Sequence, residues 1–85
     1  MEIIYSENAQ NDLKYWKQSG NKGVQKRISA LIESISINPT TGIGKPEMLK
    51  YSLSGSWSRR ITQEHRIVYS FNDERVLIET IKGHY

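Results

Sequence analysis

The last two residues of this sequence, His84 and Tyr85, are an imidazole and a phenol set side by side. Histidine is the side chain best suited to proton transfer near neutral pH, and tyrosine offers a flat face for stacking. Both follow an apolar run, residues 76–81, that is typical of a strand. If that strand is held in a sheet, the two side chains reach a fixed place on its surface. The alternative is that two solvated residues simply follow the last strand.

Residues 45–66 form a basic segment, whereas the segments on either side are nearly neutral. Its charged side chains are Lys45, Lys50, Arg59, Arg60 and Arg66, against Glu47 and Glu64. Such an excess is typical of a phosphate-binding surface, although solvated strand faces also collect Lys and Arg.

Cations, a carboxylate (Glu47) and an imidazole (His84) on one surface are what metal-independent RNA cleavage requires. A base deprotonates the ribose 2′-OH, which attacks its own phosphodiester, and an acid protonates the departing 5′-oxygen. Cations stabilise the additional negative charge of the transition state. The same side chains could also bind phosphate without reacting.

The composition, with 25% charged and 36% hydrophobic residues and a net charge of +3, is that of an ordinary globular chain. We expect one domain spanning residues 1–85. With no cysteine and with only His65 and His84 as histidines, the sequence predicts no disulfide, no metal site and no cofactor. No long apolar stretch or signal-peptide pattern opens the chain, so we expect a cytoplasmic protein without a membrane anchor.

The first half predicts a strand and two helices. Residues Glu2–Ser6 read as a strand, Ser6 as the N-cap of a helix that ends at Gly20, and Asn21 as the next N-cap. Pro39 ends the second helix because its ring blocks a further turn. Apolar residues recur at helical spacing at Ala9, Leu13 and Trp16, and at Val24, Ile28, Leu31, Ile32 and Ile35.

The second half predicts a loop and four strands. The loop, Asn38–Glu47, contains Gly42 and Gly44, which should loosen it, while Pro39 and Pro46 should stiffen both of its ends. The strands are Met48–Leu53, Trp57–Gln63, Arg66–Asn72 and Arg75–Ile81. Short connections make neighbouring strands antiparallel. We therefore predict an α+β fold of the order β-α-α-β-β-β-β, with two helices packed on one face of a twisted, mostly antiparallel sheet and the other face free.

Several motifs together resemble those of one protein family. They are Lys45-Pro46-Glu47, the run from Leu53 to Ile61 (LSGSWSRRI), the run from Glu64 to Tyr69 (EHRIVY), and His84-Tyr85. Across its whole length the chain resembles the YoeB/Txe branch of the RelE/ParE superfamily of bacterial toxin–antitoxin toxins. The resemblance implies a RelE-like fold and a ribosome-dependent endoribonuclease that cuts mRNA in the decoding site. It also implies a cognate antitoxin of the YefM or Axe kind, with a homodimer left open.

The resemblance also assigns roles to six residues. Glu47 matches the general base, His84 the general acid, Arg66 the phosphate-stabilising arginine, Lys50 and Arg60 supporting cations, and Tyr85 the residue that stacks on or positions the substrate.

Arg59, His65 and Gly83 lie near these residues in the sequence or on the same strands, and none of them is assigned a role in catalysis. Arg59 and Arg60 alternate across a strand, so only one can share a face with the site. The resemblance selects Arg60, which leaves Arg59 as a ribosomal-RNA contact or as a charge on the opposite edge. His65 is favoured as a structural residue that bonds nearby backbone rather than as a second catalytic histidine. Gly83 should leave the end of the chain more flexible than a bulky residue would.

Two other functions compete with the nuclease. A ParE-like toxin would bind DNA gyrase and cleave nothing, but such a toxin is not expected to keep Glu47, Arg66 and His84 together. A non-catalytic RNA-binding module would explain the cations, yet Glu47 would repel its phosphate ligand.

Overall fold

A computed structural model describes residues 1–50 and 55–83 of the chain. Its elements are β1 (Glu2–Tyr5), α1 (Glu7–Ser19), α2 (Lys22–Ile37), β2 (Glu47–Met48), β3 (Trp57–Arg60), β4 (Arg66–Phe71) and β5 (Arg75–Thr80). The strands form one sheet in the order β1-β5-β4-β3-β2, with β1 parallel to β5 and the other pairs antiparallel. The predicted α+β class and the β-α-α-β-β-β-β order are confirmed.

Both helices begin where their capping residues predict. Ser6 Oγ accepts a hydrogen bond from the Ala9 N–H at 3.0 Å, and Asn21 Oδ1 accepts one from the Val24 N–H at 3.0 Å. Each cap satisfies a backbone donor that the first turn leaves unpaired, and is worth about 1 kcal/mol. The second helix ends at Ile37, two residues before Pro39.

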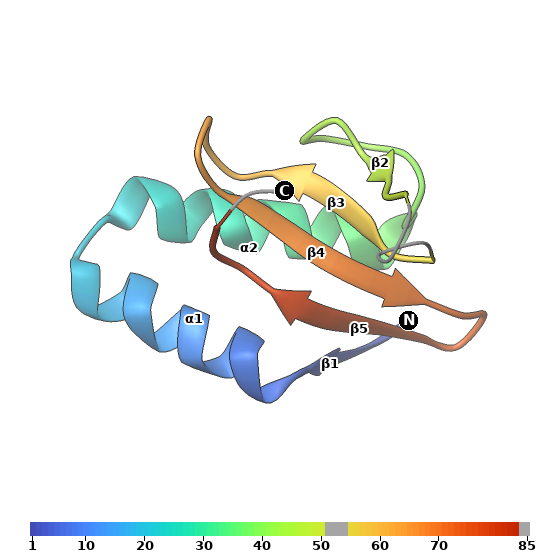
Figure 1. Ribbon diagram of the computed structural model, residues 1–85, viewed down its shortest axis with the longest axis horizontal. Helices are drawn as coiled ribbons and strands as arrows, with labels where there is room; N and C mark the ends of the chain where they lie inside the picture. The colour runs from blue at the N-terminus through green and yellow to red at the C-terminus, as the bar shows by residue number, and fades with distance from the viewer. Residues whose placement is uncertain (51–54, 84–85) are drawn as a thin grey trace.

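The helices cover one face of the sheet and leave the other free of helices. Figure 1 looks onto the free face, with α2 passing behind β3 and β4. The buried residues that the helices contribute to the core are Ala9, Trp16, Val24, Ile28, Leu31 and Ile35; the chain from the β3–β4 turn onward adds Ile61, Ile67, Tyr69, Val76, Ile78 and Ile81. We call the helix-free side the open face.

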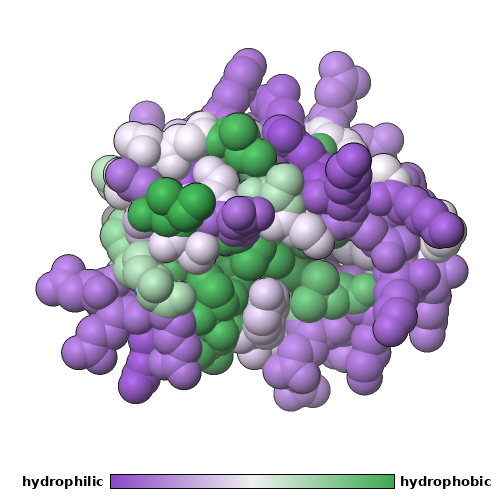
Figure 2. All heavy atoms as spheres, turned by 180° about the vertical axis from the view of Figure 1, so that it is seen from behind, coloured by the Kyte–Doolittle hydropathy of each residue, from purple (hydrophilic) through white to green (hydrophobic). Residues whose placement is uncertain are grey.

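The helix side of the molecule is apolar at its centre. Figure 2 shows apolar side chains gathered there, with hydrophilic side chains around them. Residues of β1, α1 and α2 line a groove of about 310 Å³, among them Leu13, Trp16, Ile28 and Ile32. Neither helix of the described chain is long and apolar enough to cross a membrane.

Three strands end one residue earlier than predicted, and the other two differ more from the prediction. The strand expected over Met48–Leu53 is only Glu47–Met48; Leu49 and Lys50 lie outside it, and residues 51–54 are outside the described part of the chain. The strand expected over Trp57–Gln63 ends at Arg60, because a turn follows. In that turn Thr62 Oγ1 accepts hydrogen bonds from the N–H groups of residues 64 and 65, and such side-chain acceptors compete with a strand ladder.

Candidate active site on the open face

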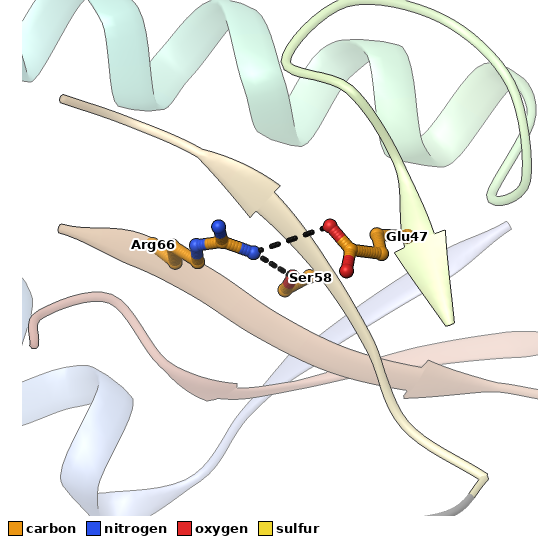
Figure 3. A network of polar contacts seen from close by, with 3 residues as sticks. All are labelled: Glu47, Ser58 and Arg66. Atoms are coloured by element: carbon orange, nitrogen blue, oxygen red, sulfur yellow. Dashed lines mark hydrogen bonds and ion pairs between the residues drawn. The ribbon is translucent and has the colours of Figure 1, made fainter. Parts of the chain in front are cut away.

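Three neighbouring strands bring Glu47, Ser58 and Arg66 together on the open face (Figure 3). Arg66 Nη1 lies 3.4 Å from Glu47 Oε2 and 3.2 Å from Ser58 Oγ. Glu47 of β2 is the register partner of Ser58 of β3, so their side chains share one face of the sheet. The predicted pair of a carboxylate and an arginine is therefore assembled, with a serine between them.

The ion pair between Glu47 and Arg66 contributes little to stability. It is long, it rests on a single oxygen–nitrogen contact, and the Glu47 side chain is 62% exposed against 20% for Arg66. Exposed pairs of this kind are typically worth 0.2–1 kcal/mol. The carboxylate therefore remains accessible to a ligand, while the guanidinium is the more buried of the two groups.

A second arginine lies beside the first. Arg60 of β3 is the register partner of Arg66 of β4, and it is exposed. Arg60 also lies two residues from Ser58 along β3, so both occupy the same face. Lys50 is exposed two residues beyond β2. The open face thus presents the guanidinium groups of Arg60 and Arg66, which can bind a phosphodiester, and it places one carboxylate next to them.

Arg59, by contrast, is a structural residue of the core. Its relative exposure is 0%, and the guanidinium donates to acceptors from α2, the following loop and β4. These acceptors are Ser34 Oγ at 2.6 Å, Ile43 O at 3.2 Å, Asn38 O at 2.6 Å, Thr41 O at 2.9 Å and Tyr69 Oη at 3.0 Å. A side chain held in this way cannot contact ribosomal RNA or carry an edge charge, so both readings of Arg59 were wrong.

The loop that leads to Glu47 is accordingly fixed, and the expectation that its glycines loosen it was wrong. The Gly44 carbonyl accepts from the Arg60 N–H at 2.7 Å, and Gly44 has a positive φ of 84°. A Cβ at this position would lie 2.6 Å from Leu31 Cδ2. Glycine is needed here because the loop passes directly over the core. Glu47 itself is the first residue of β2 rather than a loop residue.

The residues before His84 are also held. The Arg66 N–H donates to the Gly83 carbonyl at 2.8 Å, and the Gly83 N–H donates to His65 Nδ1 at 3.0 Å. The structural reading of His65, as a residue that bonds nearby backbone, is confirmed. Both backbone polar groups of Gly83 are therefore bonded, while the chain end that Gly83 was expected to make more flexible, His84 and Tyr85, lies outside the described residues.

Ser58 is a site residue that sequence reasoning missed. It is fully buried, and its hydroxyl accepts the hydrogen bond from Arg66 that orients the guanidinium. Its spacing of two residues from Arg60 was a usable signal, because alternate residues of a strand share a face.

Comparison with known proteins gives consistent matches over the whole chain. Residues 5–85 match a family model described as "YoeB-like toxin of bacterial type II toxin-antitoxin system". The toxin YoeB of Escherichia coli K12 is 46% identical over 85 residues, which cover all of both chains. A structure of the YoeB dimer from Staphylococcus aureus superimposes with a TM-score of 0.90 at 44% identity, and a YoeB–YefM complex from the same species with 0.88 at 45%. In both cases all of this chain and 98% of the other are covered.

Proposed function

The chain belongs to the YoeB-like toxins of bacterial type II toxin–antitoxin systems, and from this premise we propose that it is a ribosome-dependent mRNA endoribonuclease that inhibits translation. The observation that carries the proposal is the accessible Glu47 carboxylate beside the Arg66 guanidinium on the open face. A carboxylate held against arginines is unfavourable for simple phosphate binding, but it is what a base that deprotonates a ribose hydroxyl needs.

In the proposed reaction Glu47 removes the proton from the ribose 2′-OH. The 2′-oxygen then forms a bond to phosphorus while the bond to the 5′-oxygen breaks, and His84 donates a proton to that leaving oxygen. The products are a 2′,3′-cyclic phosphate and a 5′-hydroxyl. The scheme uses only the chain's own acid and base.

Arg66 and Arg60 would stabilise the phosphorane-like transition state, whose charge exceeds that of the substrate. Both hydrogen bonds that the Arg66 guanidinium makes within the described chain use Nη1. Its other N–H groups could therefore bind phosphate oxygens, while Ser58 keeps the plane of the guanidinium fixed. Lys50 adds a further cation at the edge of the site, and Tyr85 would stack on or position the substrate.

The ribosome would supply what the open face lacks. The site residues on the described part of the chain are mainly charged, and few of them could read a base. An mRNA held in the decoding site arrives with its backbone already oriented, and orientation alone can lower a barrier by several kcal/mol.

We also propose a protein antitoxin as partner. The YoeB of Staphylococcus aureus has been solved with YefM and as a dimer. An antitoxin of this kind would silence the enzyme most directly by placing an acidic segment over Lys50, Arg60 and Arg66. Self-association of the toxin is proposed on the same basis.

The decisive experiment is primer extension on a translated mRNA incubated with purified protein and ribosomes, beside the same RNA without ribosomes. We expect cuts only in the ribosome-bound sample and none with the Glu47→Gln variant. Cleavage of free RNA at a comparable rate would contradict ribosome dependence. Absence of cleavage in both samples, with inhibition of DNA gyrase, would favour the ParE-like alternative.

A further inference from the structure

The backbone of residues 81–83 leaves the sheet after β5 and is fixed by contacts from two separate parts of the fold. The Ile81 N–H donates to Asp12 Oδ2 at 2.8 Å, and the Ile81 carbonyl accepts from Trp16 Nε1 at 2.9 Å. The Gly83 N–H donates to His65 Nδ1 at 3.0 Å, and the Gly83 carbonyl accepts from the Arg66 N–H at 2.8 Å. The backbone N–H and C=O groups of both Ile81 and Gly83 are thus hydrogen-bonded, although neither residue belongs to a strand.

The contacts with Ile81 come from one side of α1. Asp12 and Trp16 are four residues apart and therefore lie on the same helix face. The Ile81 side chain is fully buried, and Trp16 is 6% exposed, so the first point of attachment lies within the core. Lys82 adds an outer contact, with Nζ 3.9 Å from the centre of the Tyr15 ring of the same helix.

The contacts with Gly83 come from His65, in the turn between β3 and β4, and from Arg66, the first residue of β4. Because His65 Nδ1 accepts a hydrogen bond, its imidazole proton is carried by Nε2. The His65 ring also meets the Trp16 ring edge-on, with centroids 4.9 Å apart and planes at 86°. One histidine therefore connects the two points of attachment.

The second point of attachment is joined to the open-face site. The backbone N–H of Arg66 binds Gly83, while the side chain of the same residue contacts Glu47. The backbone of Gly83 is thus placed relative to the proposed base through a single residue, Arg66. Gly83 has a φ of 91°, which an L side chain rarely adopts, so this backbone conformation depends on glycine.

We propose that Asp12, Trp16 and His65 are positioning residues of the enzyme, which hold the backbone of residues 81–83 and through it orient the proposed acid, His84, for its proton transfer. This inference rests on the proposed nuclease function. None of the three is proposed to touch the reacting atoms. They act through the backbone that precedes the proposed acid, at a site where a misplacement of 1 Å can cost about 10²-fold in rate.

The test uses paired variants of His65. His65→Leu keeps apolar bulk but removes the acceptor for Gly83, whereas His65→Asn supplies an amide oxygen near the position of Nδ1. Trp16→Phe independently removes the donor to Ile81 while keeping an aromatic ring. Gln18→Ala, on the exposed surface of α1, is the matched control.

Single-turnover cleavage of ribosome-bound mRNA is measured at saturation. We expect His65→Leu and Trp16→Phe to lower the rate about 10–100-fold with little change in half-saturating concentration. His65→Asn and Gln18→Ala should retain most activity. Equal loss in the Asn and Leu variants, or no loss in the Leu variant, would overturn the proposal.

A second substrate separates positioning from simple loss of folded enzyme. In it the scissile 5′-oxygen is replaced by sulfur, which departs without needing a proton. A displaced acid matters little on this substrate, so the deficit of His65→Leu should shrink to about threefold or less. Equal deficits on the oxygen and sulfur substrates would overturn the proposal. His84→Ala serves as the reference for a lost acid.

Amide hydrogen exchange tests the hold on the backbone without any substrate. In the His65→Leu variant the Gly83 amide should exchange faster than in the wild type, and in the Asp12→Ala variant the Ile81 amide should exchange faster. The Val76 and Ile78 amides should stay protected in both variants. Unchanged exchange at residues 81 and 83 would overturn the proposal. If the wild type cuts no RNA on the ribosome, the nuclease function fails, and the exchange data alone then decide whether these side chains hold the segment.

Discussion

Arg59 Nε donates a hydrogen bond of 3.0 Å to the Tyr69 hydroxyl, which in turn donates one of 2.6 Å to the Pro39 carbonyl. Through this chain of contacts β3 and β4 hold the end of α2 and the loop that follows it. The remaining donors of Arg59 bind three loop carbonyls and the Ser34 hydroxyl of α2 directly. The loop ends at Glu47, so the proposed base is placed on the open face by a cation buried on the opposite, helix-covered face.

Replacing Arg59 should therefore test the scaffold. Arg59→Met removes the donor of three loop carbonyls and of the Ser34 hydroxyl, all in part-buried hydrogen bonds, and we expect the free energy of unfolding to fall by roughly 3–5 kcal/mol. The exposed neighbour Arg60 provides the control, since Arg60→Met should change the free energy of unfolding by no more than about 0.5 kcal/mol. Urea unfolding of both variants measures the difference. Similar stabilities would mean that the buried hydrogen bonds contribute little.

Tyr69 should make stability fall at alkaline pH. Burial raises the pKa of Tyr69 above its ordinary value of 10.0, and this outweighs the opposing hydrogen bond and charge of Arg59. Because the folded state favours the neutral phenol, the stabilisation is complete below the pKa of the unfolded chain and is lost as pH rises through the higher pKa of the folded state. Urea unfolding at several pH values above 9, roughly, should show this decline.

Tyr69→Phe is the control for that decline. The variant should be less stable at neutral pH, because Pro39 and Arg59 lose a partner, but its stability should fall less steeply above pH 10, approximately. Absorbance titration of the tyrosines should show one fewer late-ionising group. An identical alkaline slope in the variant would assign the decline to other residues.

The helices and their caps could be predicted because their signals are local. Ser6, Asn21 and the apolar spacing in each helix act within one or two turns of the chain. Arg59 could not be placed in the same way. Strand alternation establishes that it and Arg60 face opposite sides, but its burial depends on carbonyls of Asn38, Thr41 and Ile43, which lie about twenty residues earlier and converge only in the folded chain.

The site was predicted in part for a similar reason. Glu47 and Arg66 were selected by resemblance to a family, while the sequence alone gave only a basic segment with a carboxylate. Their contact arises from strand register between β2, β3 and β4, which no local pattern specifies. Register also explains Ser58, whose hydroxyl gains a role only when Arg66 lies on the next strand.

Glu47→Gln should lower the single-turnover rate of mRNA cleavage on the ribosome by about 10²–10⁴-fold, the usual contribution of one general base. The amide keeps the size of the side chain and removes its ability to take a proton. Ribosome binding should change little, and so should stability, because the lost ion pair is exposed. A rate near that of the wild type would remove Glu47 from the mechanism.

Ser58→Ala should have a smaller effect on the same assay. It removes one acceptor of the Arg66 guanidinium, and a single hydrogen bond of this kind is worth about 0.5–1.5 kcal/mol, or roughly a 2–10-fold loss of rate. Arg66→Lys should lose more, since a lysine cannot present a planar fork to two phosphate oxygens. If the serine variant were as slow as the lysine variant, Ser58 would contact the substrate itself.

Ribosome binding should weaken steeply with salt, because cations of the open face replace counterions on RNA phosphates. The logarithm of the binding constant should fall linearly with the logarithm of salt concentration. Removing one contacting cation, as in Lys50→Met or Arg60→Met, should reduce the slope by about 1. Arg27→Met, which lies on α2, is a comparison outside the proposed site. An unchanged slope in the Lys50 and Arg60 variants would place the RNA elsewhere.

Tyr85 should act by stacking or positioning rather than by proton transfer, because a phenol with an ordinary pKa of about 10 is a poor base at neutral pH. Tyr85→Phe keeps the aromatic face and should retain most cleavage activity. Tyr85→Ala should lose what one stacked base contributes, about 1–3 kcal/mol, which corresponds to roughly 5–150-fold in rate. Single-turnover cleavage by the two variants measures both effects. If the Tyr85→Phe and Tyr85→Ala variants lose activity equally, the hydroxyl group rather than stacking of the ring is responsible for the contribution of Tyr85.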